Sequence, residues 1–425
     1  MEAAQSNHWW QKGNFYSLYI NAFAGDIPTL IDRLDYFSIL GIDCLHILPH
    51  YPSPLHDDGY DITDHTGVRP ELGTVADFTA LCTAAHGRGI QIMVDLVLNH
   101  VSSEHPWFIE ARQSKNNPKR DFFLWSENGE GFDGAPNVFP DFKSSNWLPN
   151  QATGDFYYAT FKPSQPDLNW SNPAVLDAML EVVDALIAQG ADGFRLDAIM
   201  NLVEKEGTNS VGIPETHARI KDLRTYLDTH YPGVIILGEI IGTTAESKVY
   251  FGQGNECNLA YNFELMNEIL YAVRLGSRAD RLRAVLESVK KIPKNSAWLA
   301  FLRNHDSLSL HLLDPARQAK LLHTFDPDGL YAFSKSTETA QRLFSLLGED
   351  EALMREAFTM LYSLPTATVL YYGDEIGMKN TAPIEPGGDM RRVVRAEFDW
   401  EEANRQMADS DSLFHFVRKC ISKRT

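Results

Sequence analysis

The stretch Gly193-Phe194-Arg195-Leu196-Asp197 is a short apolar run that carries two opposite charges two residues apart. A helical pattern ends just before it, at Gly190, so the run is predicted to be a buried strand. In a strand, Arg195 and Asp197 share one face. An arginine beside an aspartate favours the ionised carboxylate, which is the form that a nucleophile needs. An isolated Arg-x-Asp pair is more typical of a structural ion pair, so a catalytic interpretation of it depends on the rest of the chain.

Short apolar runs alternate with longer helical patterns along the chain, as in βα units around a parallel sheet. The predicted strands are Phe15 to Ile20, Cys44 to Leu48, Ile90 to Val97, Gly193 to Asp197, Val234 to Glu239, Asn258 to Phe263, Ala297 to Phe301 and Thr368 to Tyr372. The predicted helices include Ile27 to Leu40, Val75 to Arg88, Pro173 to Gln189, Pro214 to His230, Leu265 to Arg274, Glu349 to Ser363 and Asp411 to Lys423. Eight such pairs predict an α/β fold, a (β/α)8 TIM barrel, whose chemistry lies at the C-terminal ends of the strands.

One segment interrupts this alternation. From Val101 to about Trp170 the chain is rich in Asn, Asp, Pro, Gly and aromatic residues and shows no helical period. We therefore predict an inserted subdomain over residues 101–170, after the third strand, and a barrel built from residues 1–100 and 171–425. Such an insertion beside the catalytic face would form one wall of a cleft. A second Pro- and Gly-rich stretch, Lys379 to Val394, predicts a loop.

Composition narrows the classes of function. The chain of 425 residues is 44% hydrophobic and 22% charged, which is typical of a globular protein with ample core. Its formal charge of −19 argues against a nucleic-acid or anionic-membrane partner, so we expect a small neutral substrate. We expect a cytoplasmic protein, since the first residues do not form a leader and no run approaches eighteen apolar residues. The four cysteines lack metal-binding spacing, and we expect neither cofactor nor metal; the oligomeric state stays open.

Polar residues follow three more of the predicted strands. Asn99 and His100 close the third strand after Asp95, Glu239 closes the fifth, and Asn304-His305-Asp306 follows the seventh. Each group taken alone also fits a structural role, such as a hydrogen-bonded core histidine. Taken together with Asp197, they gather acids, histidines and an arginine without a Ser/His/Asp order, a phosphate loop or a Cys/His metal set. Such a set indicates carboxylate-based glycoside chemistry.

With these residues, the chain resembles the α-amylase family of glycoside hydrolases. The four signature regions of that family match DLVLNH, GFRLDAIM, LGEI and RNHD here, and further family stretches match GIDCLHILP, QPDLNW and GDEIGM. The resemblance implies a retaining double displacement with Asp197 as nucleophile, Glu239 as acid/base and Asp306 as transition-state stabiliser. These roles agree with Arg195 beside Asp197 and with Glu239 at the end of an apolar strand.

The resemblance also implies a subsite for one sugar ring. His100 and His305 would hydrogen-bond its hydroxyls, and Tyr60 would stack on the ring. Asp57 would grip the non-reducing O4 and pair with Arg395, which would block the pocket beyond one glucose and make the enzyme exo-acting. An ion pair between surface loops is the alternative for Asp57 and Arg395.

Finer signals separate branches of the family. The stretch QPDLN at residues 165–169 resembles the oligo-1,6-glucosidase branch, and Ala198 after the nucleophile is similar to relatives that prefer α-1,4 bonds. We therefore expect a retaining α-glucosidase or transglucosylase for short α-glucosides. The alternative is trehalose synthase (maltose α-D-glucosyltransferase), an enzyme that isomerises maltose to trehalose. The resemblance to it lies in the stretch Tyr51 to Asp64, YPSPLHDDGYDITD. A sucrose-active enzyme is a further alternative, as is an inactive amylase-like binding protein, although such proteins typically lose acids that this chain keeps.

Two departures from the family matter. The stretch Ala22 to Pro28 is short and lacks the Asp/Asn-rich loop that binds calcium in many relatives, so calcium is not expected there. Many relatives continue into a C-terminal β-sandwich, whereas this sequence stops at Thr425 as the eighth helix closes. We therefore expect that domain to be absent.

Overall fold

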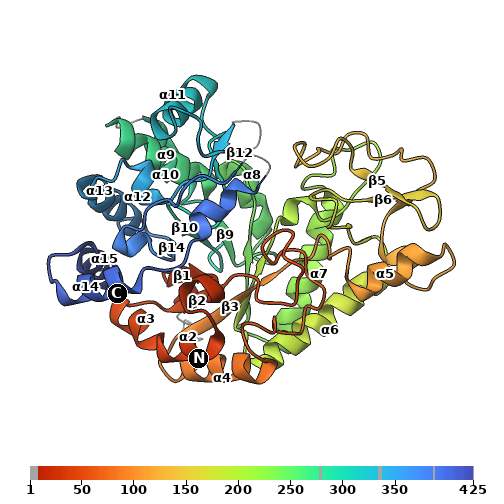
Figure 1. The fold of residues 1–425 in the computed structure, drawn as a ribbon, viewed down its shortest axis with the longest axis horizontal. Coiled ribbons are helices and arrows are strands. Elements are labelled where there is room, and N and C mark those ends of the chain that lie inside the picture. The colour runs from red at the N-terminus through yellow and green to blue at the C-terminus, as the bar shows by residue number, and fades with distance from the viewer. Residues whose placement is uncertain (1–7, 277–279, 334–336, 386–387, 425) are drawn as a thin grey trace.

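Eight parallel strands close into a barrel (Figure 1). The computed structural model describes residues 8–276, 280–333, 337–385 and 388–424, and the structural statements below concern these residues. Around the barrel the strands follow one another as β1, β14, β10, β9, β8, β7, β3 and β2, which is the cyclic order of a (β/α)8 barrel. Their bounds are β1 Asn14–Leu18, β2 Cys44–Ile47, β3 Gln91–Leu96, β7 Gly193–Leu196, β8 Ile235–Gly238, β9 Leu259–Tyr261, β10 Ala297–Ala300 and β14 Ala367–Tyr371. The predicted barrel is thus confirmed, and each strand lies within the range predicted for it or within one residue of it.

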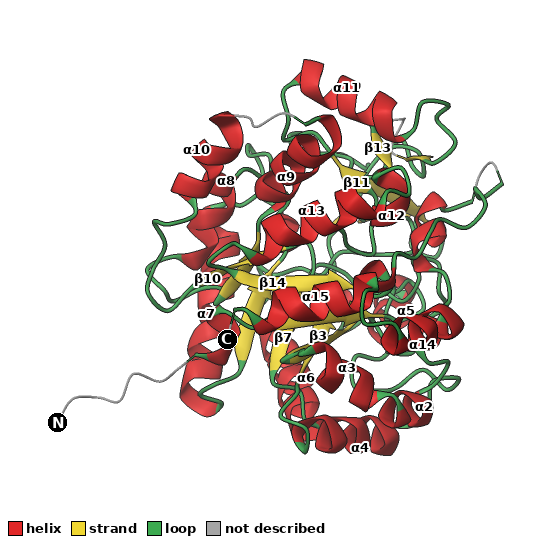
Figure 2. Cartoon of the chain, turned by 90° about the vertical axis from the view of Figure 1, so that its left-hand side faces the viewer, coloured by secondary structure: helices red, strands yellow, loops and turns green. Residues whose placement is uncertain are grey.

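Helices pack around the barrel strands (Figure 2). They are α1 Ile20–Phe23, α2 Ile27–Asp32, α3 Leu34–Leu40, α4 Val75–His86, α6 Pro173–Gln189, α7 Pro214–His230, α8 Thr244–Lys248, α9 Phe263–Leu275, α10 Asp280–Ser288, α11 Pro315–Phe325, α12 Leu343–Leu346, α13 Glu351–Tyr362, α14 Trp400–Ala408 and α15 Leu413–Ser422. The helix predicted over residues 27–40 is two helices, because the chain turns at Arg33 between α2 and α3. Short helices such as α8 and α12 were not predicted, since four or five residues are too few to show a helical period.

The longest helices begin and end at sequence signals that act locally. In α6, the Asn172 side chain accepts a hydrogen bond from the Ala174 N–H, and Pro173 occupies the first turn. At the other end, Gly190 adopts the left-handed conformation, with φ of 112°, and its N–H bonds to helical carbonyls. These signals explain why the helix was predicted with its correct bounds.

Between β3 and β7 the chain leaves the barrel and forms a small antiparallel sheet with the order β4-β6-β5. Its strands are β4 Trp125–Ser126, β5 Trp147–Asn150 and β6 Asp155–Tyr158, and helix α5 Pro106–Gln113 precedes them. Figure 1 shows this segment, in orange and yellow, to one side of the barrel. The sequence predicted no helix here; α5 begins at His105-Pro106, where the His105 side chain accepts a hydrogen bond from the Trp107 N–H. The exact boundaries of a subdomain over residues 101–170 stay a prediction.

A second excursion, between β10 and β14, was not predicted. It holds a three-stranded sheet with the order β11-β13-β12, made of β11 Leu308–Ser309, β12 Ala332–Phe333 and β13 Glu338–Thr339. Strands of two residues leave no alternation of polar and apolar side chains to detect. The 3-10 helix η6 Met390–Arg395 likewise begins inside the stretch predicted as a loop and ends one residue beyond it. The other 3-10 helices are η1 Trp9–Gln11, η2 Arg120–Phe122, η3 Ile199–Asn201, η4 Val249–Phe251 and η5 Asp374–Ile376.

The end of α6 yields a stability prediction. A Cβ atom on Gly190 would lie 2.6 Å from the Cβ of the buried Cys82, in addition to the strain of a left-handed backbone. We expect Gly190→Ala to lower the free energy of unfolding by about 2–4 kcal/mol, as measured by urea denaturation. The matched control is Gly154→Ala, because Gly154 has φ of 71° and a Cβ atom added to it would meet nothing within 4 Å. Gly154→Ala should lower the free energy of unfolding by only about 1 kcal/mol. Equal losses in both variants would contradict a steric clash between the Gly190→Ala side chain and Cys82.

Candidate active site

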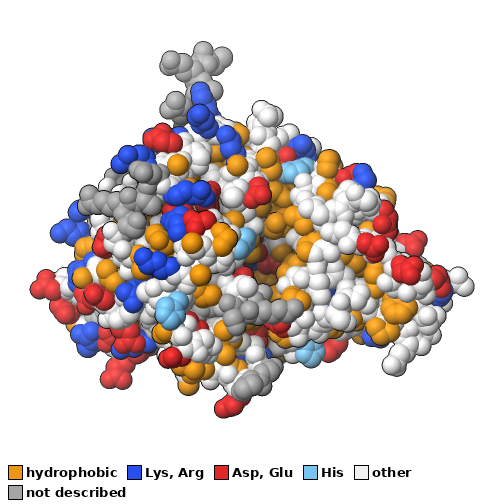
Figure 3. All heavy atoms as spheres, turned by 90° about the horizontal axis from the view of Figure 1, so that it is seen from above, with side chains coloured by type: hydrophobic (Ala, Val, Ile, Leu, Met, Phe, Trp, Pro, Cys, Tyr) orange, Lys and Arg blue, Asp and Glu red, His pale blue; other side chains and the backbone are white. Residues whose placement is uncertain are grey.

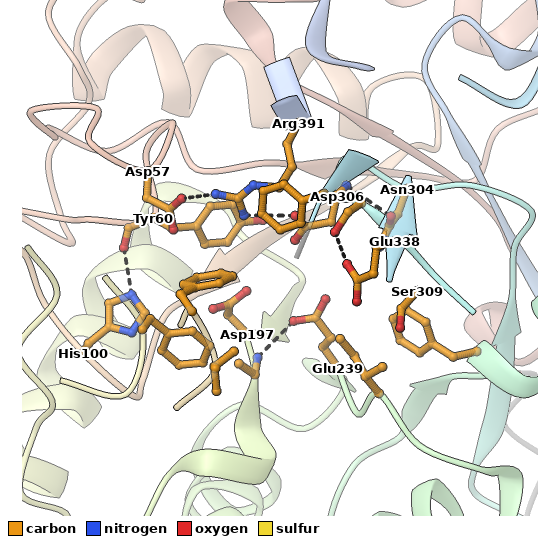
Figure 4. A pocket seen from close by; sticks show the side chains of 18 residues that line it. Asp57, Tyr60, His100, Asp197, Glu239, Asn304, Asp306, Ser309, Glu338 and Arg391 are labelled. Atoms are coloured by element: carbon orange, nitrogen blue, oxygen red, sulfur yellow. Dashed lines mark hydrogen bonds and ion pairs between the residues drawn. The ribbon is translucent and has the colours of Figure 1, made fainter. Parts of the chain in front are cut away.

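A pocket opens at the carboxyl ends of the barrel strands, where both excursions meet the barrel. Figure 3 looks into a hollow with hydrophobic side chains around it and acidic atoms in its depth. The cavity measures about 160 Å³. Six of the predicted site residues line it, namely Asp57, Tyr60, His100, Asp197, Glu239 and Asp306 (Figure 4). The remaining lining residues are Val138, Phe139, Phe161, Ala198, Ile241, Phe263, Asn304, Ser307, Ser309, Phe333, Glu338 and Arg391.

Arg195 lies beneath the floor of this pocket and contacts three carboxylates. Its side chain is 1% exposed. Nη1 forms ion pairs with Asp95, its neighbour across β3 and β7, and with Asp197 at 2.9 Å. Nη2 lies 2.5 Å from Oε1 of Glu239, just after β8. One guanidinium thus fixes the two pocket carboxylates, Asp197 and Glu239, side by side.

The charge balance differs from the one expected for Asp197. Burial raises the pKa of Asp197, Arg195 lowers it, and the carboxylates of Glu239 and Asp95 raise it again, so that it stands well above its usual value. The expectation that Arg195 would give Asp197 a low pKa was therefore wrong, because burial and the carboxylates of Glu239 and Asp95 outweigh Arg195. By contrast, Arg195 and His46 overcome the burial of Asp95 and hold its pKa at about 2. Asp197 is therefore protonated more readily than an isolated aspartate would be.

Tyr60 and His305 form a stacked pair on one wall. Their ring centroids are 5.4 Å apart with planes 10° apart, and the Tyr60 hydroxyl lies 2.8 Å from Nε2 of His305. Arg195 also donates to this hydroxyl, at 3.2 Å. Burial and the two neighbouring arginines hold the pKa of His305 well below its usual value. His305 does not line the pocket itself; it contacts Tyr60, which does.

His100 approaches the pocket from the end of the third barrel strand. Its Nε2 lies 3.2 Å from the carbonyl oxygen of Tyr60 and 2.9 Å from Nε2 of Gln165. Burial lowers the pKa of His100 to about 4, so the ring is neutral near pH 7. A neutral imidazole can donate one hydrogen bond and accept another, as binding to hydroxyl groups requires.

Asp57 forms ion pairs with two cationic side chains at one end of the pocket. Its Oδ1 lies 2.5 Å from Nη2 of Arg391 and 2.8 Å from Nζ of Lys162, and Gln165 donates to its Oδ2. Burial opposes ionisation, but Arg391 and Lys162 outweigh it and lower the pKa of Asp57 to about 2. Asp389 contacts the same two cations and completes the cluster.

The predicted pair of Asp57 and Arg395 is wrong, because Arg395 contacts Asp58 instead, at 2.5 Å. Both Arg391 and Arg395 belong to η6. In a 3-10 helix, residues three apart share a face. Arg392 and Arg395 both reach Asp58, whereas Arg391 points to a different side and reaches Asp57.

Asp306 contacts two arginines of η6, of which Arg391 lines the pocket. Its Oδ1 lies 3.0 Å from Nη1 of Arg391 and 3.5 Å from Nη2 of Arg395. Burial raises the pKa of Asp306, but the two arginines lower it by more. The pKa of Asp306 therefore lies below its usual value. Asp306 is thus an ionised carboxylate at the pocket wall, held opposite Asp197 and Glu239 in Figure 4.

Residues 5–317 match the family described as alpha amylase, catalytic domain. The chain belongs to the α-amylase family. The family predicted from the signature regions is thereby confirmed, and with it the enzyme class of glycoside hydrolases at the level of the family.

The relatives of this chain include trehalose synthases and oligo-1,6-glucosidases. The chain is 42% identical over 403 residues to the trehalose synthase/amylase TreS of Mycobacterium tuberculosis, an alignment that covers 92% of this chain and 66% of that protein. It is 31% identical over 407 residues to an oligo-1,6-glucosidase of Halalkalibacterium halodurans, with 88% and 66% covered. The chain thus spans just under two thirds of the length of these relatives. In fold it matches the crystal structure of trehalulose synthase MutB from Pseudomonas mesoacidophila MX-45, with a TM-score of 0.79, 24% identity, and 98% of this chain and 84% of that chain covered.

Several residues of this α-amylase family pocket were not predicted. They are Arg391, Phe139, Phe333 and Glu338, together with Lys162, which contacts Asp57; all lie in the two excursions or in η6, where no periodic pattern assigns a side chain to a face. The only available signal was Arg391 in the Met390–Arg395 stretch, since an arginine four residues before Arg395 could equally pair with Asp57.

Two further findings concern the described part of the chain. Within it, no three His, Cys, Asp or Glu side chains are grouped so that they could hold a metal ion. None of the helices in these ranges is both long and apolar enough to cross a membrane.

The cluster around Asp57 predicts a pH dependence of stability. The pKa of Asp57 is about 2 in the folded protein and about 4 in an unfolded chain. Such a lowered pKa stabilises the fold above about pH 4, and the contribution is lost as the pH falls toward 2. Between pH 6 and pH 3, urea unfolding should show the wild type losing about 1 kcal/mol more than Asp57→Asn. An equal loss in both proteins would show that Asp57 is not coupled to Arg391 and Lys162.

Proposed function

We propose that the protein is a retaining α-glucosyl transferase that converts maltose to trehalose, with hydrolysis of maltose as a competing reaction. Its similarity to TreS of Mycobacterium tuberculosis, a trehalose synthase/amylase, exceeds its similarity to an oligo-1,6-glucosidase. The sequence alone favoured an α-glucosidase or transglucosylase, with trehalose synthase as the alternative. The relatives support the alternative better.

The observation that carries the proposal is the closed end of the pocket. Asp57, Arg391 and Lys162 form ion pairs across it, and Asp389 lies behind them. A sugar that reaches Asp197 would meet this cluster with its non-reducing end. Charged side chains that are already fixed can hydrogen-bond the hydroxyls of one glucosyl unit and leave no path for a second. The site therefore suits short α-glucosides better than the interior of a polymer.

The roles of the acids follow from their contacts. Asp197 attacks the anomeric carbon, the glycosidic C–O bond breaks, and Glu239 gives its proton to the leaving oxygen. The products of this first step are a β-glucosyl ester on Asp197 and a free glucose. Asp306, kept ionised by Arg391 and Arg395, faces the positive charge that develops at the anomeric carbon.

The other predicted residues bind or position the donor ring. Tyr60 stacks on the sugar, and its own orientation is fixed by His305 and Arg195. His100, neutral near pH 7, is suited to bind a hydroxyl. Arg391 takes the role that was assigned from the sequence to Arg395.

The second step decides between the two activities. An acceptor hydroxyl gives its proton to Glu239 while its oxygen attacks the anomeric carbon, and the ester bond to Asp197 breaks. Attack by the 1-hydroxyl of the released glucose gives trehalose, and attack by water gives a second glucose. Phe139, Phe161 and Phe333 line the pocket and limit its hydration, which favours the retained sugar. Ala198, beside the nucleophile, leaves room for the acceptor.

Product analysis tests the function. NMR of maltose incubated with the protein should show trehalose together with a smaller amount of glucose, and incubation with trehalose should return maltose. Asp197→Asn, which removes the nucleophile, is the negative control and should reduce both products by at least about a thousandfold. Glucose as the sole product would identify an α-glucosidase instead. Mixed oligosaccharides from soluble starch before any glucose would refute the closed pocket.

The two arginines of η6 give a matched pair of variants. Arg391→Ala leaves the buried Asp57 with one cation less, and truncating one member of a buried pair costs about 3–5 kcal/mol. We expect kcat/KM for maltose to fall by roughly a hundredfold or more. Arg395→Ala should cost less than about tenfold, because its main ion pair is to Asp58 outside the pocket. A larger loss in Arg395→Ala than in Arg391→Ala would restore the pairing predicted from the sequence.

A further inference from the structure

A carboxylate outside the three catalytic acids also faces the pocket. Glu338 begins β13, in the excursion between β10 and β14, and its half-buried side chain lines the cavity. The Ser307 hydroxyl donates to its Oε2 at 2.5 Å. Among the described residues no cation lies within 4 Å of it, whereas Asp57 and Asp306 both contact Arg391. Glu338 thus presents a hydrogen-bond acceptor to the cavity that no described cation neutralises.

The position of Glu338 relative to Glu239 identifies the part of the substrate that it could meet. Figure 4 shows Asp57 and His100 at one end of the pocket and Glu338 and Ser309 at the other, with Asp197 and Glu239 between them. The acid/base must reach the oxygen that joins donor and acceptor. The donor glucose occupies the Asp57 end, so the acceptor lies beyond Glu239, against Glu338.

We propose that Glu338, positioned by Ser307, binds hydroxyl groups of an acceptor glucose and so determines the preference for sugar over water in the second step. This inference rests on the proposed function and assigns the acceptor side of the same pocket. A carboxylate oxygen accepts a charge-assisted hydrogen bond from a sugar hydroxyl, and its two oxygens can serve neighbouring hydroxyls. Phe263 and Ile241, which line the same cavity, supply apolar surface for the C–H face of the ring.

The step that Glu338 serves needs no further reactant. The acceptor hydroxyl passes its proton to Glu239, its oxygen forms the new bond to the anomeric carbon, and the ester bond to Asp197 breaks. Glu338 holds the acceptor through hydroxyls that do not react. Its loss should therefore let water compete for the same glucosyl ester, while the ester itself can still form.

The experiment uses α-D-glucosyl fluoride as donor and free glucose as acceptor, because fluoride leaves without any sugar in the acceptor position. Fluoride release reports formation of the ester, and chromatography gives the amounts of disaccharide and of newly released glucose per fluoride. The ratio of these two amounts is the readout. Glu338→Gln should lower this ratio by roughly tenfold or more at a fixed glucose concentration, and Glu338→Ala at least as much. Ser307→Ala, which keeps the carboxylate and removes its hydrogen bond, should lower the ratio by a smaller factor.

The matched control is Asp328→Asn, which removes an exposed carboxylate of the same excursion outside the pocket and should keep the wild-type ratio. If the wild type makes disaccharide and both Glu338 variants keep its ratio, the inference is overturned and the proposed function stands. If the wild type releases fluoride but yields only glucose at every acceptor concentration, no acceptor site exists and the inference is again overturned. A wild type that releases no fluoride overturns the proposed function itself.

Discussion

The buried guanidinium of Arg195 is the group on which the rest of the site depends. It lies at the centre of the barrel's carboxyl end and forms ion pairs with Asp95, Asp197 and Glu239. A buried charge is tolerated only when it is paired and hydrogen-bonded, so three strands must end in the right register for Arg195 to be stable. The same requirement brings the two reacting carboxylates together. The same contacts therefore stabilise the fold and position the two reacting carboxylates.

The distribution of that single positive charge also sets the protonation of the site. Asp95, also bonded to His46, has a pKa of about 2, because Arg195 and His46 outweigh its burial. Asp197 is left with burial and the nearby Glu239, and its pKa rises. Arg195 thus holds Asp197 and Glu239 side by side without giving Asp197 a low pKa.

The two excursions from the barrel complete what the strand ends begin. Phe139 of the first and Phe333 of the second meet edge to face, with centroids 6.4 Å apart, and the Arg391 guanidinium lies over both rings. Arg391 in turn contacts Asp57 and Asp306. Loops from distant parts of the chain therefore close around one arginine of the pocket wall. The donor end is built from fixed charges, and the acceptor end, with Ser307, Ser309 and Glu338, is built from hydrogen-bonding groups.

The sequence by itself determined the eight strands, the bounds of α6 and α7, and the grouping of Asp197, Glu239 and Asp306 at one edge. Periodicity, capping residues and the common direction of parallel strands act over a few residues, so they can be read along the chain. Only the tertiary structure decided that Asp57 pairs with Arg391 and not with Arg395, that Arg195 divides its charge among three acids, and that Glu338 faces the pocket. These contacts join residues as much as 334 positions apart. They depend on how a 3-10 turn and two irregular excursions pack, and no local pattern in the sequence encodes that packing.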